Sequence, residues 1–188
     1  MAAQIASDGQ WRFPETDSVP LKFELCIVYF EDEYFYRHPG INPVSIFRAI
    51  KQNLKAKKTV SGGSTISSQV IRIWRGDKQR SIFQKFIEFY LALRLEMQYS
   101  KKEILNLYAS HAPFGGNVVG IEAAAWRYYG RSVGNLSWGE SATLAVLPNS
   151  PSLIFPGKNH ERLLLKRNRL LDKLQLKRVI DETTCELA

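Results

Sequence analysis

Apolar residues recur at helical spacing along most of this chain, whereas the alternation typical of strands is scarce. Residues 21–30 are almost continuously apolar and predict a buried helix that delivers Glu31 and Asp32 to a cleft. Residues 44–54 have apolar positions at helical spacing and basic residues opposite them, which predicts a basic amphipathic helix. Further helices are expected over 65–74, 82–97, 100–108, 122–128, 141–147 and 161–176.

Local signals mark where these helices begin and where the chain turns. Ser100 followed by Glu103, and Ser137 followed by Glu140, have the capping-box pattern of a helix start. Residues 61–63 predict a mobile loop, and glycines and a proline between 113 and 120 predict a turn-rich connection. Without an internal repeat or an interdomain linker, the pattern indicates one mainly α domain.

Size and composition narrow the class of protein. A chain of 188 residues is long enough to bury one sizeable core. Its net charge of +8 favours a polyanionic partner, namely nucleic acid, anionic lipid or a phosphorylated substrate. Two cysteines, Cys26 and Cys185, exclude a disulfide-rich scaffold and a four-cysteine zinc site, and the three histidines lack metal-ligand spacing. These residues therefore imply no metal site.

Targeting signals are missing from these 188 residues. The first eight residues do not have the pattern of a signal peptide. No apolar run reaches the ~18 residues that a membrane-spanning helix needs. As given, the chain is not expected to be an integral membrane protein.

Glu31 and Asp32 are the first candidates for acid–base chemistry. A carboxylate at the end of an apolar run loses hydration, which is expected to raise its pKa and make it a usable base. The alternative is that the pair only caps a helix or forms an ion pair. Phe35 is most simply a core residue, and His38 before Pro39 is more often a local hydrogen-bonding residue than a catalyst.

The second candidate is the stretch from Gly62 to Thr65, at a predicted helix start. Backbone N–H groups, hydroxyls and the helix dipole suit a phosphate oxygen there, although the spacing of a Walker loop is absent. The alternative is an ordinary N-cap. Gln69 and Arg72 follow at positions that share part of the helical face of Ser64.

A third candidate is the pair formed by Lys85 and Glu88, three residues apart on a predicted helix. An ordinary surface ion pair is the alternative. Phe83, Phe86 and other apolar neighbours predict that one side of the pair meets a core or cleft. There Glu88 would give a second carboxylate opposite Glu31.

These segments together resemble the peptidoglycan glycosyltransferases, glycosyltransferase family 51, found in class A penicillin-binding proteins and as monofunctional enzymes. Glu31-Asp32 through Phe35, His38 and Gly40 matches the first motif, EDxxFxxHxG, at every fixed position. Residues 62–69 match the second motif, GGSTxxxQ.

The remaining motifs are matched in part. Lys85 and Glu88 match the third motif, RKxxE, with Gln84 in place of its arginine. Lys102-Glu103-Ile104-Leu105 through Tyr108 resembles the fourth, KxxILxxYLN, with Ala109-Ser110 in place of Leu-Asn and Asn106 where Glu is frequent. Lys166-Arg167-Asn168 resembles the arginine-rich fifth motif, and residues 112–117 are similar to the 1C type of penicillin-binding protein.

The resemblance implies a mainly α, lysozyme-like single domain over 11–178, between an N-terminal tail at 1–10 and a C-terminal tail at 179–188. It places a small, mobile, membrane-facing subdomain at about 44–58, where the basic amphipathic pattern suits anionic lipid. A solvated helix packed on the body of the domain is the alternative for this segment.

The implied reaction is polymerisation of lipid II into β-1,4-linked glycan with release of undecaprenyl pyrophosphate. Glu31 would be the base, with Asp32 supporting it, and Glu88 would be the second catalytic carboxylate, orienting cations or a divalent ion. The resemblance requires no cofactor and leaves Mg²⁺ or Mn²⁺ open at the pyrophosphate. The substrate-binding residues it implies are Asp32, Phe35, His38, Ser64, Thr65, Gln69, Arg72, Arg80 and Lys85.

The expected partners are lipid II, the lipid-linked growing strand, an anionic membrane surface and a transpeptidase, but not nucleic acid. The expected location is the outer face of the bacterial inner membrane, held peripherally. The family usually carries a transmembrane anchor, and its bifunctional members also carry a transpeptidase domain. The chain is therefore expected to be an excised domain, a split or truncated product, or a soluble relative. Gln84, Ala109 and Ser110 keep an inactive lipid II or glycan-binding module open, and a lysozyme-like hydrolase is a third hypothesis.

Overall fold

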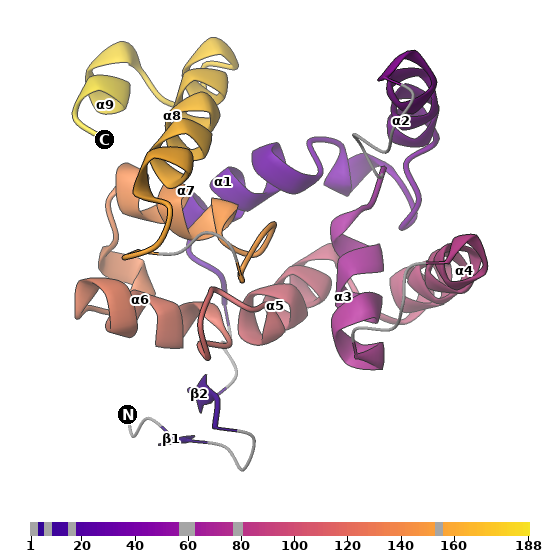
Figure 1. Ribbon diagram of the computed structural model, residues 1–188, viewed down its shortest axis with the longest axis horizontal. Helices are drawn as coiled ribbons and strands as arrows, with labels where there is room; N and C mark the ends of the chain where they lie inside the picture. The colour runs from indigo at the N-terminus through magenta and orange to yellow at the C-terminus, as the bar shows by residue number, and fades with distance from the viewer. Residues whose placement is uncertain (1–3, 6–8, 15–17, 57–62, 77–80, 153–155) are drawn as a thin grey trace. The chain divides into compact units, whose positions relative to one another are not determined.

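The computed structural model describes residues 4–5, 9–14, 18–56, 63–76, 81–152 and 156–188 (Figure 1). Within these ranges the fold is mainly helical, as the sequence predicts. The elements in chain order are β1 (Gln4–Ile5), β2 (Trp11–Arg12), α1 (Leu21–Glu31), η1 (Phe35–Arg37), α2 (Pro43–Ala56), α3 (Ile66–Arg75), α4 (Ile82–Gln98), α5 (Lys101–His111), α6 (Ile121–Tyr129), η2 (Val133–Asn135), α7 (Trp138–Val146), α8 (His160–Leu176) and α9 (Glu182–Glu186).

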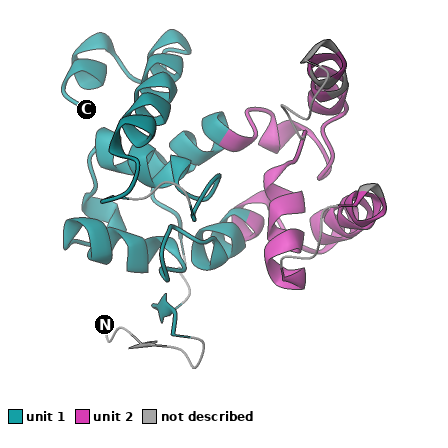
Figure 2. Cartoon of the chain, in the orientation of Figure 1, with its two compact units in different colours: residues 1–30, 105–188 teal, residues 31–104 magenta. Residues whose placement is uncertain are grey.

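The chain divides into two compact units (Figure 2). Unit 1 comprises residues 1–30 and 105–188, and unit 2 comprises residues 31–104. Both crossings fall inside helices, because α1 ends at Glu31 and α5 begins at Lys101. Continuous helices carry no linker composition, which explains why the sequence indicates a single domain.

The core of unit 1 is built from aromatic and aliphatic side chains. Phe23 on α1 and Phe114 are completely buried, and their ring centroids lie 6.2 Å apart. Helix α7 packs on α8 and on α6. Each large apolar side chain fully removed from water stabilises the fold by about 1.5–3 kcal/mol. Other large side chains buried here include Ile27, Leu105, Tyr108, Ile121, Leu136, Leu144 and Leu147.

The N-terminal segment expected as a tail contains β1, which pairs with β2 in antiparallel register. The Trp11 N–H donates to the Asn117 carbonyl at 2.8 Å, and the Val119 N–H donates to the Trp11 carbonyl at 3.0 Å. Strand β2 therefore runs along the turn-rich connection of unit 1.

The segment after residue 178, also expected as a tail, contains the short helix α9. The last residue packs on α7, since a Cβ placed on Gly139 would lie 2.1 Å from the Ala188 carbonyl oxygen. A residue with a Cβ atom therefore does not fit at position 139 unless the chain shifts. The end of the chain is therefore part of unit 1.

The C-terminal turn of α1 is held by α8. Lys173 Nζ donates to the Tyr29 carbonyl at 2.6 Å and lies 5.8 Å from the centroid of the Tyr29 ring. The last carbonyls of a helix lack partners within it and carry partial negative charge, so a lysine suits this position. The part of this turn that belongs to unit 1 is thereby held against α8.

Unit 2 is organised around α3 and α4, which pack against each other. Its completely buried apolar residues include Phe35, Ile66, Ala92 and Ile104. Gly40 has a φ of +87°, and a Cβ there would lie 2.8 Å from the Ala92 carbonyl oxygen. The segment after Glu31 therefore approaches α4 backbone to backbone, which only glycine permits.

Two helices of unit 2 carry exposed apolar side chains. On α2, Val44, Phe47 and Leu54 are 63%, 72% and 74% exposed. On α4, Phe83 and Phe86 are 69% and 67% exposed, so these two neighbours of Lys85 and Glu88 do not lie in the core. None of the described helices is both long enough and apolar enough to cross a bilayer.

Candidate active site

Glu31, the last residue of α1, is hydrogen-bonded to a residue of α3. The Gln69 side-chain amide donates to Glu31 Oε2 at 2.8 Å. Glu31 is half-buried and Gln69 is buried. The contact joins the predicted base to the last residue of the second motif, 38 positions further along the chain.

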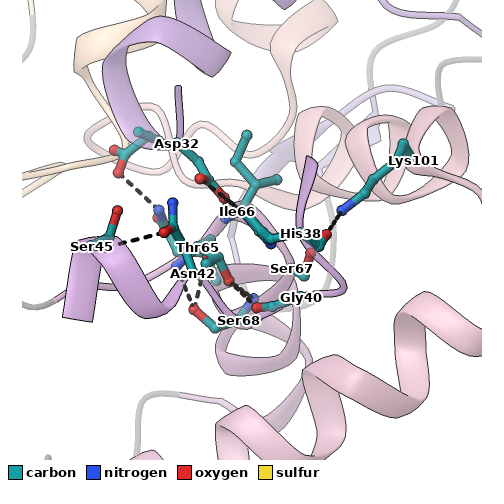
Figure 3. A network of polar contacts seen from close by, with 12 residues as sticks. Asp32, His38, Gly40, Asn42, Ser45, Thr65, Ile66, Ser67, Ser68 and Lys101 are labelled. Atoms are coloured by element: carbon teal, nitrogen blue, oxygen red, sulfur yellow. Dashed lines mark hydrogen bonds and ion pairs between the residues drawn. The ribbon is translucent and has the colours of Figure 1, made fainter. Parts of the chain in front are cut away.

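Asp32 and His38 form a buried pair immediately after Glu31 (Figure 3). His38 Nε2 lies 3.0 Å and 2.9 Å from the two Asp32 carboxylate oxygens. Asp32 Oδ2 also accepts a 3.3 Å hydrogen bond from the Ile66 N–H, at the start of α3. Asp32 therefore ties the turn after Glu31 to α3. Phe35 lies in the core, as the sequence predicts.

The start of α3, expected to hold a phosphate, is already occupied by internal hydrogen bonds. The Thr65 N–H donates to Ser68 Oγ at 3.0 Å, and the Ser68 N–H donates to Thr65 Oγ1 at 3.2 Å, which is a capping box. The next N–H, of Ile66, is bound by Asp32. The structure thus favours the N-cap interpretation for Thr65, and half-buried Ser64 stands one residue before the cap.

The cationic candidates lie on α3 and α4. Arg72 and Lys85 are half-buried, and Lys85 Nζ lies 5.6 Å from the centroid of the Phe89 ring. Arg75 Nη2 donates to Gln84 Oε1 at 2.8 Å. A guanidinium therefore reaches the position where the third motif has arginine, although it is supplied by a different residue.

The structure gives fewer contacts for the remaining predicted site residues. Glu88 is half-buried on α4. Some predicted residues lie outside the part of the chain that the structure describes. They are Arg80, Lys57, Lys58 and residues 61–62 of the loop predicted over 61–63.

The described residues do not form a metal site by themselves. Among them, no three His, Cys, Asp or Glu side chains are grouped closely enough to hold an ion. Glu88 alone does not complete a ligand set for Mg²⁺ or Mn²⁺, which would need oxygen ligands from a bound phosphate.

A second basic region lies within unit 1. A hollow of about 260 Å³ is lined by Tyr29, Phe30, Lys166, Arg169, Leu170 and Lys173. Lys166, from the segment that resembles the fifth motif, also donates to Asn149 Oδ1 at 2.6 Å. Three cations around one hollow favour an anionic ligand.

The sequence reasoning missed Lys101, whose ammonium contacts both Glu96 and the His38 carbonyl. The signal was present, because counting back from Ile104 in KxxIL places the motif's lysine at Lys101. The alignment to Lys102 is one residue off, and Lys102 is exposed. Ala109 is completely buried, so its departure from the motif is a change in the core.

Comparison with known proteins agrees with the motifs. The model of the family described as "Transglycosylase" matches residues 1–175. Penicillin-binding protein 1C of Escherichia coli (strain K12) is 41% identical over 174 residues, which cover 92% of this chain and 22% of that protein. Penicillin-binding protein 1A of Aquifex aeolicus (strain VF5) is 38% identical over 166 residues, which cover 88% of this chain and 22% of that protein.

A solved structure shares the fold. The crystal structure of penicillin-binding protein 1A from Haemophilus influenzae matches 95% of this chain and 17% of its own, with a TM-score of 0.56 and 20% sequence identity. The chain spans about a fifth of the length of the curated relatives described above. The predicted family is confirmed: the chain belongs to the transglycosylases, glycosyltransferase family 51, whose domains occur in class A penicillin-binding proteins.

Proposed function

We propose that this chain is a peptidoglycan glycosyltransferase that polymerises lipid II into β-1,4-linked glycan and releases undecaprenyl pyrophosphate. The hydrogen bond from Gln69 to Glu31 carries the proposal, because it brings residues of the first two motifs to one point. The family match over residues 1–175 supports the same reaction class.

Glu31 is the general base. Its carboxylate takes the proton of the 4-hydroxyl of the acceptor GlcNAc, and that oxygen attacks C1 of the donor MurNAc. The bond from C1 to the pyrophosphate oxygen breaks, and the configuration at C1 inverts. Gln69 engages one carboxylate oxygen and so limits rotation of the group, which favours proton transfer in a fixed geometry.

The departing pyrophosphate carries negative charge that fixed cations stabilise. Arg72, Lys85 and Arg80 are the residues proposed for this role, with Ser64 as a hydroxyl donor. Glu88 lies one helical turn from Lys85 and orients that ammonium. Arg75, which contacts Gln84, adds a cation that the motif alignment does not include.

An anionic membrane surface is the proposed site of action, on the outer face of the bacterial inner membrane. Exposed apolar residues on α2, together with exposed Arg48 and Lys51, suit the boundary between headgroups and acyl chains. The lipid-linked substrate and growing strand are available there. A transpeptidase is the proposed protein partner, because the product strands need cross-linking.

The test is polymer formation on lipid II in detergent, analysed on a gel. The unmodified chain should extend glycan strands, and Glu31→Gln should abolish extension while circular dichroism shows an intact fold. Glu33→Gln is the matched control, since it neutralises a carboxylate two residues away and should retain activity. Glu88→Gln should reduce extension severely. Polymer made by Glu31→Gln would refute the assignment of the base.

The same assay separates the alternatives. An inactive binding module would bind lipid II equally with and without Glu31→Gln and would make no polymer in either form. A hydrolase would shorten preformed glycan instead of extending lipid II.

A further inference from the structure

Lys101, on α5, contacts α4 and the segment 32–40 within unit 2 (Figure 3). Its Nζ lies 2.7 Å from Glu96 Oε1 and 2.7 Å from Glu96 Oε2. The same ammonium donates to the His38 carbonyl at 2.6 Å and lies 4.4 Å from the centroid of the Phe35 ring. The ammonium therefore meets acceptors or an aromatic face on several sides.

Glu96 extends this junction to α3. The Ser67 hydroxyl donates to Glu96 Oε1, and Ser67 is completely buried in the first turn of α3. The Glu96 side chain is 7% exposed, and that of Lys101 is 21% exposed. An ion pair that is this far buried holds its geometry, because separating the two groups would leave each charge with neither its partner nor full hydration.

The segment after Glu31 is fastened to the same turn of α3. Asp32 accepts from the Ile66 N–H, and Thr65 Oγ1 donates to the Gly40 carbonyl at 2.6 Å. Lys101 holds the middle of this segment through the His38 carbonyl. The first turn of α3 and the turn after Glu31 are thus locked together by three independent contacts.

One helical turn beyond Ile66 stands Gln69, the donor to Glu31. The position of Gln69 relative to Glu31 depends on how α3 sits against the segment 32–40. The ion pair of Lys101 and Glu96 contacts both parts of that arrangement, the His38 carbonyl and the Ser67 hydroxyl.

We propose that Lys101, paired with Glu96, is a positioning residue of the glycosyltransferase reaction. It keeps Gln69 at hydrogen-bond distance from Glu31 and thereby holds the base in its reactive orientation. The inference rests on the proposed function for its kinetic consequence, but its structural consequence can be measured without turnover.

The variants are chosen to separate positioning from folding. Lys101→Met alone would leave the buried Glu96 carboxylate without its cation, so the double variant Glu96→Gln/Lys101→Met removes both charges and keeps the side-chain lengths. Ser67→Ala cuts only the link from Glu96 to α3. Lys101→Arg keeps the charge. Lys102→Met is the matched control, because Lys102 is the exposed neighbour.

Two measurements decide the proposal. In steady-state assays on lipid II, the double variant and Ser67→Ala should lower kcat by about ten- to a hundredfold, as small misplacement of a reacting group does, and leave KM within about threefold. Lys101→Arg should recover most of kcat, and Lys102→Met should match the unmodified chain. In NMR spectra, the Gln69 side-chain amide signal, assigned from its loss in Gln69→Ala, should move toward its position in Glu31→Ala.

Each outcome has a defined meaning. An unchanged kcat in the folded double variant or in folded Ser67→Ala, or a Gln69 signal in its original place in either of them, overturns the proposal. If the double variant does not fold, Ser67→Ala decides by the same two measurements. If the unmodified chain makes no polymer, the proposed function fails, and movement of the Gln69 signal in Ser67→Ala still tests the positioning role.

Discussion

The side-chain amide of Gln69 donates a 2.8 Å hydrogen bond to Oε2 of Glu31. The two residues belong to different motifs and to different helices: Glu31 is the last residue of α1, and Gln69 lies near the start of α3. A donor aimed at one oxygen of a carboxylate fixes its orientation and stabilises its charged form. This arrangement suits a base that must meet a sugar hydroxyl in a defined direction.

Gln69→Ala is expected to reduce kcat for glycan extension by about ten- to a hundredfold, because the Glu31 carboxylate then samples more orientations. KM for lipid II should change little. Gln98→Ala is the control, since Gln98 is exposed at the end of α4. Initial rates over a range of lipid II concentrations measure both constants. Equal kcat values for Gln69→Ala and the unmodified chain would contradict the role given to this hydrogen bond.

Gly40→Ala is expected to destabilise the fold more than Gly76→Ala. Both glycines have positive φ, +87° and +70°, so both substitutions strain the backbone. Only at Gly40 does the new Cβ meet another atom, the Ala92 carbonyl oxygen at 2.8 Å; at Gly76 nothing lies within 4 Å. We expect a loss of about 1–2 kcal/mol at Gly76 and about 2–4 kcal/mol at Gly40. Urea denaturation measures both, and equal losses would show that α4 moves aside.

Binding to anionic vesicles should depend on the exposed side of α2. Phe47→Gln/Leu54→Gln removes two exposed apolar side chains and should weaken binding to phosphatidylglycerol vesicles by about tenfold or more. Leu176→Gln/Leu187→Gln is the matched control, because these leucines are 81% and 84% exposed in unit 1. Vesicle flotation, at low and high salt and with uncharged phosphatidylcholine vesicles, separates the apolar contribution from the charge. Equal loss in both double variants would argue against α2 as the contact.

The two cysteines should differ sharply in reactivity toward thiol reagents. Burial raises the pKa of the Cys26 thiol to about 12, whereas Cys185 is near the end of the chain with a pKa raised by burial and by the Asp172 and Glu186 carboxylates. At pH 8, modification of the folded chain should occur at Cys185, and Cys26 should react only after unfolding. Mass spectrometry of labelled peptides locates the modification. Fast labelling of Cys26 in the folded chain would show that α1 opens readily.

The same thiol makes a contribution to stability with a defined pH dependence. The folded pKa of Cys26, about 12, is higher than the value in an unfolded chain, so the neutral form is favoured by folding. This contribution is fully present below the unfolded value. It decreases as the pH rises from there toward 12. Cys26→Ala should therefore flatten the alkaline decline in the free energy of unfolding.

Local sequence signals were enough to place most of the helices. Predicted helices over 21–30, 82–97 and 161–176 correspond to α1, α4 and α8 within one residue at each end. The helix predicted over 141–147 begins earlier in the structure, because α7 starts at Trp138, directly after its N-cap Ser137. The five-residue α9 was missed, since it is too short to show helical periodicity.

The sequence by itself determined the helices, their capping boxes and the family, because periodicity, caps and motif spacing are set by residues within a few positions of one another. Tertiary structure alone decided that Gln69 reaches Glu31, that Phe83 and Phe86 face outward, and that Lys101 joins Glu96 to the His38 carbonyl. These outcomes depend on which faces of helices meet. Packing of segments tens of residues apart fixes that choice, and a pattern read along the chain does not contain it.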